Sequence, residues 1–236
     1  MPDPDSSPAP PLIPPQFLFR YSFAVQYVAR MPRQGKSLLG LPASCAFPNL
    51  AALDGPAARA PAGALRLAWN AAGLGVAVEV QGKSQPPRCL PDDPAGSDGL
   101  QVWFDTRNTQ SIHRASRFCC HFCLLPHGGQ GHPAPVVVQR PIARAREEAP
   151  ADSAGLIRIR AESTARGYLL EAWFPAEALH GFDAEANPRL GFYYALNESE
   201  LGPQYLSVNS EFPFATDPSL WSTLELTKPR AAGRSP

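Results

Sequence analysis

The middle of the sequence alternates strictly between apolar and more polar positions. From 100 to 105, Leu100, Val102 and Phe104 alternate with glutamine, tryptophan and aspartate, and from 118 to 125 every even-numbered position is phenylalanine, cysteine or leucine. Successive side chains of a strand point to opposite faces of the sheet, so this period of two is typical of strands with one face in a core. The pattern predicts two strands joined by a polar, basic loop.

The same pattern extends to the rest of the chain. Aromatic residues at alternate positions predict a first strand over 17–28. A short helix is predicted at 175–179, because proline suits the first turn of a helix, while the 28 prolines argue against long helices. Further strands are predicted at 65–69, 75–81, 100–105, 117–125, 136–138, 156–162, 168–174, 190–196 and 224–226.

Segments of a different kind lie outside these strands. Residues 1–16 are rich in proline and are expected to form a disordered tail, as are residues 229–236. The long irregular segment 31–64 carries scattered apolar residues. A loop of that length needs a structural reason, such as wrapping the domain or covering one of its ends. We therefore expect one folded domain over 17–228, of the all-β class, with a long irregular N-terminal segment.

Composition narrows the classes of function. A hydrophobic content of 44% suits a globular core, and 21 basic residues balance 21 acidic ones, so electrostatics favours neither nucleic acid nor an anionic membrane as a partner. We find no apolar run of about 18 residues and no secretory signal. Five cysteines, three of them within 119–123, do not form the even pattern of a disulfide framework, so we expect a reducing, cytoplasmic location.

Five segments, in this order, resemble one known family. They are LRLAWNAAGLGVAVEVQGK at 65–83, SDGLQVWFDTR at 97–107, RGYLLEAWFPAEAL at 166–179, LGFYYALNE at 190–198 and DPSLWSTLEL at 217–226. Together they resemble the family 9 carbohydrate-binding modules and the wider DOMON-like β-sandwich group. The resemblance implies a two-sheet antiparallel β-sandwich that binds sugars with aromatic rings at one end. It also implies structural calcium and a role as an accessory to glycoside hydrolases.

The chain departs from this family at the aromatic clamp. A sugar-binding member is expected to carry one tryptophan where this chain has DPAGS at 93–97, and another where it has FPFAT at 212–216. Sugar binding is therefore inferred from the resemblance in fold. The missing clamp favours an alternative, in which the same fold serves as a protein-interaction or structural domain without a sugar site.

Candidate ligand residues come from the tryptophans and from the loop after position 105. Trp103 alternates away from the apolar face and is expected on the less buried face, although tryptophan usually packs in a core. Clustered arginines in the loop suit an anionic group on a ligand, or else pair with Asp105, Glu147 or Glu148. The predicted contacts to a saccharide or polyol are Trp103, Trp69, Asp105, Arg107, His113, Arg114, Arg117 and Asn197.

Two groups of residues raise the question of a metal. Cys119, His121 and Cys123 share one face of a predicted strand and are good zinc ligands, but alternate residues of a strand lie about 7 Å apart. Oxygen-rich loops can hold calcium, yet the acids lack EF-hand spacing and are more simply solvated. These acids are Asp92, Asp93, Asp98, Glu198, Glu200 and Asp217. We assign no metal ligands, and a metal-binding or redox protein built on 119–123 is a third hypothesis.

Catalytic motifs are missing from the sequence. It contains no GxSxG, no HExxH and no P-loop. Glu147 and Glu148 are neighbours in sequence, which does not fix the separation across a sugar bond that a glycosidase needs. The sequence therefore predicts a non-catalytic protein similar to a carbohydrate-binding module, linked to polysaccharide breakdown, whose partner is a saccharide or polyol.

Overall fold

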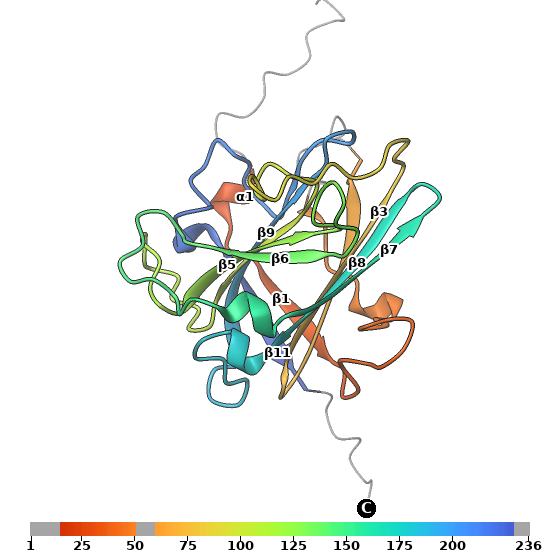
Figure 1. The fold of residues 1–236 in the computed structure, drawn as a ribbon. Helices are drawn as coiled ribbons and strands as arrows, with labels where there is room; N and C mark the ends of the chain where they lie inside the picture. The colour runs from red at the N-terminus through yellow and green to blue at the C-terminus, as the bar shows by residue number, and fades with distance from the viewer. Residues whose placement is uncertain (1–14, 51–59, 229–236) are drawn as a thin grey trace, which may run out of the picture.

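The computed structural model describes residues 15–50 and 60–228 (Figure 1). The predicted tails at 1–14 and 229–236 lie outside these residues, while positions 15 and 16 begin a helical turn. The helical elements are α1 (Pro15–Leu18), η1 (Ala43–Cys45), η3 (Ser153–Leu156), η4 (Ala176–Ala178) and η5 (Pro218–Leu220). The strands are β1 (Ser22–Tyr27), β2 (Gly63–Asn70), β3 (Gly73–Gln81), β4 (Gly99–Asp105), β5 (Cys119–Leu125), β6 (Val136–Arg140), β7 (Arg158–Thr164), β8 (Gly167–Pro175), β9 (Arg189–Asn197), β10 (Gln204–Tyr205) and β11 (Ser222–Thr227).

The described strands form one continuous sheet in the order β6-β5-β4-β9-β11-β1-β2-β3-β8-β7, with β10 added to β9. The all-β prediction is confirmed, but the prediction of two separate antiparallel sheets is not. The reason is β1, which pairs in parallel with β11 along one edge and with β2 along the other. This strand passes from one half of the molecule to the other and joins the two halves by hydrogen bonds.

The two halves of the sheet face each other across a shared core. Phe104 of β4 and Phe122 of β5 both contact the ring of Phe174 on β8, with centroids 5.2 and 5.5 Å apart. These rings belong to one large cluster of buried apolar residues that draws on both halves. The even-numbered residues of β4 and β5 therefore enter the core, as their alternation predicts.

Each predicted strand has a counterpart in the structure, with shifted ends. The first strand is shorter than the expected 17–28, and the predicted helix at 175–179 is a single 3₁₀ turn, η4. The two-residue strand β10 carries too short a pattern for the sequence to reveal it. Within 15–50 and 60–228, no helix has the length and apolar character needed to span a membrane.

The turn between β2 and β3 shows how local sequence sets the strands. Asn70 ends β2, and its side-chain oxygen accepts a hydrogen bond from the N–H of Ala72 at 2.9 Å, which is typical of asparagine in turns. Gly73 opens β3 at φ +150, and a Cβ there would lie 2.1 Å from the carbonyl oxygen of Phe174 on β8. Glycine is therefore required where β3 comes close to β8.

The irregular segment after β1 covers the outer face of β2, β3 and β8. Leu38 and Leu39 pack there with Trp173 in a second buried apolar cluster. The buried carboxylate of Glu171 accepts hydrogen bonds from the backbone N–H groups of Leu38 (2.8 Å), Leu39 (3.1 Å) and Gly40 (3.0 Å). Over its described part, up to residue 50, this long segment wraps the domain, as the sequence suggested.

Candidate functional site

The loop that joins β4 to β5, residues 106–118, is shaped by the buried carboxylate of Asp105. This residue is 1% exposed, and its side chain accepts hydrogen bonds from the N–H groups of Arg107 (2.9 Å) and Thr109 (2.6 Å). Burial raises the pKa of Asp105, although these hydrogen bonds work in the opposite direction. Asp105, predicted as a ligand contact, therefore sets the loop conformation from inside the protein.

On one side, the loop is tied to β11 and to the residues just before β1. Arg20 donates to the backbone and side-chain oxygens of Gln110 at 3.0 and 3.1 Å. The amide of Gln110 donates to the hydroxyl of Thr223, and that hydroxyl donates to the side chain of Asn108 at 3.1 Å. This series of hydrogen bonds fixes the first half of the loop against β11.

Beside these contacts, His113 meets Asp217 and Ser219. His113 Nδ1 lies 3.1 Å from Asp217 Oδ2 and 3.2 Å from Ser219 Oγ, and Ser219 Oγ donates to Asp217 Oδ1 at 2.6 Å. Partial burial works to raise the pKa of Asp217, but hydrogen bonds from Ser219 and His113 hold this pKa below its ordinary value. A catalytic relay needs the serine and the aspartate on different ring nitrogens. Here both contact Nδ1, so the group can orient a ligand but is not arranged to activate Ser219.

On its other side, the loop is tied to the segment after β6. Arg114 donates to the carbonyl oxygens of Arg144 (2.8 Å) and Ala145 (3.3 Å). Arg117 lies 3.9 Å from the carboxylate of Glu147, so one of the pairings left open by the sequence is present. The loop therefore connects two separate parts of the surface.

The three predicted arginines are engaged by partners within the protein. Arg107 and Arg117 place their guanidinium groups 4.6 and 5.2 Å from the ring centroid of Phe118. Cation–π contacts of this kind orient the side chains along the loop surface. With Arg114 bound to backbone carbonyls, each of the three arginines has a partner within the protein.

The two predicted tryptophan contacts are buried. Trp103 is 2% exposed, stacks on His121 with ring centroids 4.1 Å apart, and meets Phe214 edge-on at 5.5 Å. The expectation that Trp103 lies on an exposed face is wrong, because the segment that carries Phe214 covers the outer face of β4. Trp69 is also buried, and its Nε1 donates to the carbonyl of Val25 at 3.0 Å. Packing accounts for both rings.

Asn197 lies at the opposite end of β4 from the 106–118 loop. It pairs with Gly99, whereas the loop starts beyond Asp105, which pairs with Gly191. At a rise of about 3.3 Å per residue, the two ends of β4 are about 20 Å apart. The side chain of Asn197 donates to the carbonyl of Ala95. Asn197 and the loop therefore cannot touch the same small ligand.

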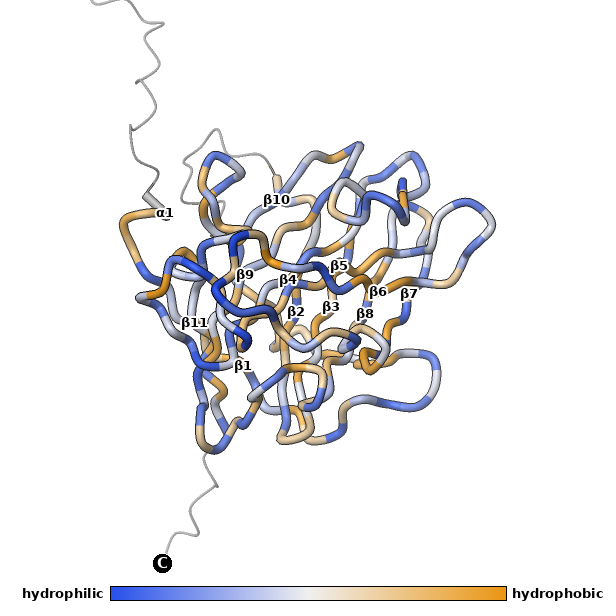
Figure 2. The backbone as a smooth tube through the Cα atoms, turned by 60° about the vertical axis from the view of Figure 1, so that its left-hand side comes forward, coloured by the Kyte–Doolittle hydropathy of each residue, from blue (hydrophilic) through white to orange (hydrophobic). Residues whose placement is uncertain are grey.

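A small hollow that the sequence did not reveal lies beside His113 and Arg20. It has a volume of about 180 Å³. Phe17 is 46% exposed and Phe19 is 63% exposed, which is unusual for large aromatic residues, and Figure 2 shows this apolar stretch at the outside of the molecule near α1. Phe17 also stacks on Phe212 at 5.0 Å. We name this hollow the aromatic cleft and define it by Phe17, Phe19, Tyr21, Ser207, Ser219 and Ser222.

Two of the acids expected to be solvated, Asp98 and Glu198, are instead buried around a cation. The buried ammonium group of Lys83 lies 2.9 Å from Asp98 and 2.5 Å from Glu198, and Tyr168 donates to the other oxygen of Glu198. Burial opposes the charge on Lys83, yet its hydrogen bonds to both carboxylates raise its pKa. Lys83 therefore supplies the positive charge between these two acids. Over the described ranges, no group of three or more His, Cys, Asp and Glu side chains is placed to hold a metal ion.

Burial keeps the thiols and the imidazole on the outer face of β5 uncharged. Burial raises the pKa of the Cys119 and Cys123 thiols to about 12 and lowers the pKa of His121 to about 3. The thiols of the metal-free protein are therefore protonated at neutral pH. His121 Nε2 lies 3.1 Å from the side-chain oxygen of Gln101, which gives it a partner within the sheet.

A second and larger hollow, of about 540 Å³, lies along β6. One wall is β6 with the adjoining end of β5, and the other is the segment 145–154, which Arg114 ties to the 106–118 loop. We name it the β6 cavity. The residues that define its chemistry are Val137, Ile142, Ala149, Glu147, Glu148 and Asp152.

Comparison with known proteins defines the class of fold. No protein-family model matches the sequence, and no curated protein matches it either. Solved structures do match, and they show that the chain has the fold of the family 9 carbohydrate-binding modules.

Two of these structures are family 9 modules from Caldicellulosiruptor kristjanssonii. The module in complex with glucose superposes with a TM-score of 0.56 at 15% identity, over 91% of this chain and 100% of the other. The module in complex with cellotriose has a TM-score of 0.50 at 16% identity, over 74% of this chain and 79% of the other. A protein from Bacteroides uniformis, named as a candidate carbohydrate-binding protein, has a TM-score of 0.52 at 12% identity, over 89% of this chain and 100% of the other.

Proposed function

We propose that this chain is a non-catalytic saccharide-binding protein and that its ligand occupies the aromatic cleft. The proposal is supported by the shared fold with modules that were solved in complex with glucose and with cellotriose. Because a fold hosts many functions, the proposal depends on the chemistry of the cleft.

The observation that carries the proposal is the pairing of exposed rings with hydroxyl groups. Phe17 and Phe19 leave about half or more of their surface open, beside a hollow lined by Ser207, Ser219 and Ser222. Aromatic faces carry partial negative charge and attract the C–H groups of a sugar ring, while hydroxyl groups exchange hydrogen bonds with its hydroxyls. A volume of about 180 Å³ is below the usual range of about 300–1,000 Å³ for ligand pockets. The cleft therefore suits one sugar ring or the end of a chain.

The 106–118 loop supports this cleft from one side. His113 reaches the cleft through Ser219, and Gln110 holds Arg20, which also lines it. Arg107 and Arg117 contact Phe118 and Arg114 contacts backbone carbonyls, all away from the cleft, so we place these arginines outside the saccharide contact. The absence of a relay geometry at Ser219 supports a binding role without catalysis.

Titration of the purified protein with glucose, cello-oligosaccharides and a wider panel of saccharides tests the proposal. We expect saturable binding that Phe19→Ala weakens about tenfold, equivalent to about 1.4 kcal/mol. Leu156→Ala is the matched control, because Leu156 is 47% exposed but lies on η3, outside the cleft. Loss of affinity in Leu156→Ala equal to that in Phe19→Ala, or no saccharide binding by the folded protein, would contradict the proposal.

The second candidate function is a protein-interaction domain that has kept the fold without a sugar site. The burial of Trp69, Trp103 and Trp173 favours it, since these rings are closed to ligands. Exposed Phe17 and Phe19 also suit a protein interface. The saccharide titration separates the two candidates. A link to polysaccharide breakdown, and a cytoplasmic location, remain parts of the first proposal that need polymer-binding and fractionation experiments.

A further inference from the structure

Strand β6 has one free edge. It is the last strand at its end of the sheet, and within 15–50 and 60–228 it pairs with β5 alone. Its sequence VVVQR is rich in β-branched residues, and its first four residues are half-buried. The outward-facing N–H and C=O groups of such an edge are a template for another extended chain.

The β6 cavity runs along this free edge. Val137 and Gln139 point to one face of the strand and Val138 and Arg140 to the other, yet all four line the cavity. A hollow over one face would be lined by alternate residues only, so this hollow lies along the strand edge. It therefore gives a ligand access to the backbone of β6.

The opposite wall of the cavity is held in place. Gln139 donates to the carbonyl of Pro150 at 2.9 Å and accepts from the N–H of Ser153 at 3.0 Å. In Figure 1, η3 lies beside β6 with the loop that leads to it. These contacts hold the wall at a distance that leaves the cavity of about 540 Å³, within the range typical of ligand sites.

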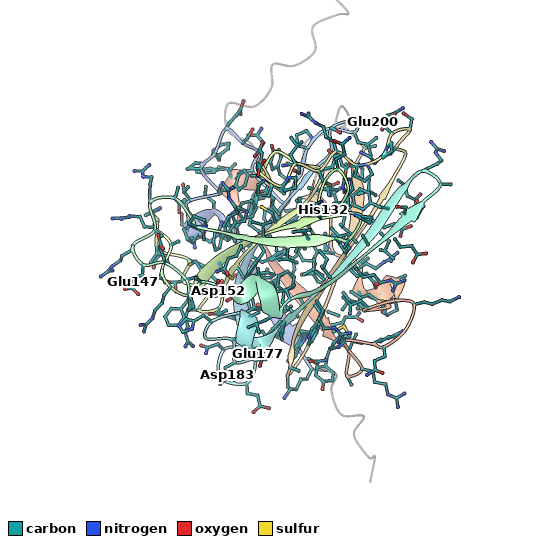
Figure 3. All side chains as sticks on the ribbon, viewed as in Figure 1. His132, Glu147, Asp152, Glu177, Asp183 and Glu200 are labelled. Atoms are coloured by element: carbon teal, nitrogen blue, oxygen red, sulfur yellow. The ribbon has the colours of Figure 1, made fainter. Side chains whose placement is uncertain are left out.

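The rim of the cavity is acidic. Glu147, Glu148 and Asp152 contribute three negative charges, against one positive charge from Arg140. Figure 3 shows Glu147 and Asp152 on the η3 side of the molecule. The pairing of Glu147 with Arg117 is long, at 3.9 Å, and both side chains are more than half exposed, so Glu147 can turn to another cation.

We propose that the β6 cavity binds an extended basic segment of a partner protein. The segment adds to the free edge of β6 as a further strand, its small apolar side chains enter the cavity, and its Lys or Arg side chains meet the acidic rim. Strand addition explains why both faces of β6 contribute to the lining, and charge complementarity explains the rim. A saccharide is a poorer occupant, because no aromatic ring lines this cavity. The inference is independent of the saccharide proposal.

The test uses the full chain and a labelled peptide, acetyl-Val-Arg-Val-Lys-Val-amide, followed by fluorescence anisotropy. We expect saturable binding that weakens as salt rises. Two N-methylated versions separate strand addition from simple attraction of charges. One carries methyl groups on the first, third and fifth residues, and the other on the second and fourth. A strand uses the N–H groups of one edge only, so one version should lose binding and the other should retain it.

Protein variants complete the test. Combining Glu147→Gln with Glu148→Gln should weaken peptide binding about tenfold, whereas Glu162→Gln, an exposed acid on β7, should leave it unchanged. Bound peptide should also slow amide hydrogen exchange at alternate residues of 136–140. Four results would overturn the proposal: no saturable binding, equal binding of both N-methylated peptides, equal binding of a peptide with Glu in place of Arg and Lys, or self-association of this chain through β6 instead.

Discussion

The aromatic cleft and the β6 cavity are both linked to the loop 106–118 by hydrogen bonds, but they differ in chemistry. The cleft is small, with exposed rings and hydroxyl groups beside Arg20, while the cavity is three times larger and joins an apolar floor to an acidic rim. The loop reaches the first through His113 and the second through Arg114. The comparison teaches that one loop can support two hollows of different chemistry, and that fold likeness alone does not say which one binds a ligand.

The largest expected effect is a loss of stability of the fold that carries both sites. Lys83→Met would leave the carboxylates of Asp98 and Glu198 buried without their cation, which costs about 3–5 kcal/mol in comparable buried pairs. We expect urea denaturation to show this loss, with Lys228→Met, a change at an exposed lysine, close to the native protein. The wild-type midpoint should not respond to calcium or to its removal with a chelator. A small loss in Lys83→Met, or a midpoint that rises with calcium, would mean that Lys83 is not the cation of this network.

Acid should also lower the free energy of unfolding, because of His121. This residue lies on β5, between β4 and β6. Its folded-state pKa is lowered from 6.5 to about 3, so protonation favours the unfolded chain. The stability that His121 contributes is complete above pH 6.5 and falls by about 1.4 kcal/mol per pH unit below it, until about pH 3. At pH 5 the expected loss is about 2 kcal/mol. His121→Gln should flatten the dependence of unfolding free energy on pH over this window, and parallel profiles for the two proteins would contradict the assignment.

The smallest effects should distinguish the two sites. His113→Ala removes a contact to Ser219 and should weaken saccharide binding about threefold without changing peptide binding. Arg114→Ala releases the segment at 144–145 and should weaken peptide binding about threefold without changing saccharide binding. Titration of both variants with both ligands checks this. Equal losses for both ligands in either variant would show that the loop acts as one unit and that the two sites are not independent.

The strands could be predicted from the sequence because their pattern is local. Alternation of apolar residues located β4 and β5, and the order of motifs indicated the all-β fold that the chain shares with family 9 modules. The pairing of the two halves through β1 could not be predicted, because strand neighbours are set by contacts between distant parts of the chain. The alternation of apolar and polar residues shows where a strand lies, but it does not show which strands pair with each other.

The site was harder to predict than the fold, for the same physical reason. Trp103 alternates away from the core, but Phe214, more than a hundred positions further along, covers it. Phe19 continues the alternation of β1 and was therefore assigned to a strand face, yet the strand begins only at Ser22 and leaves Phe19 in solvent. Whether a distant segment covers a residue, as at Trp103, or leaves it exposed, as at Phe19, cannot be predicted from the neighbouring sequence.

The most direct test of the saccharide proposal is to map ligand contacts by NMR. The labelled protein would be titrated with cellotriose, and backbone amide shifts would be followed along the described chain. The account predicts saturable shifts concentrated at 17–21, 207–208 and 219–222, with little change at 136–154. No saturable shifts, or shifts centred on the β6 cavity, would contradict a saccharide site in the aromatic cleft.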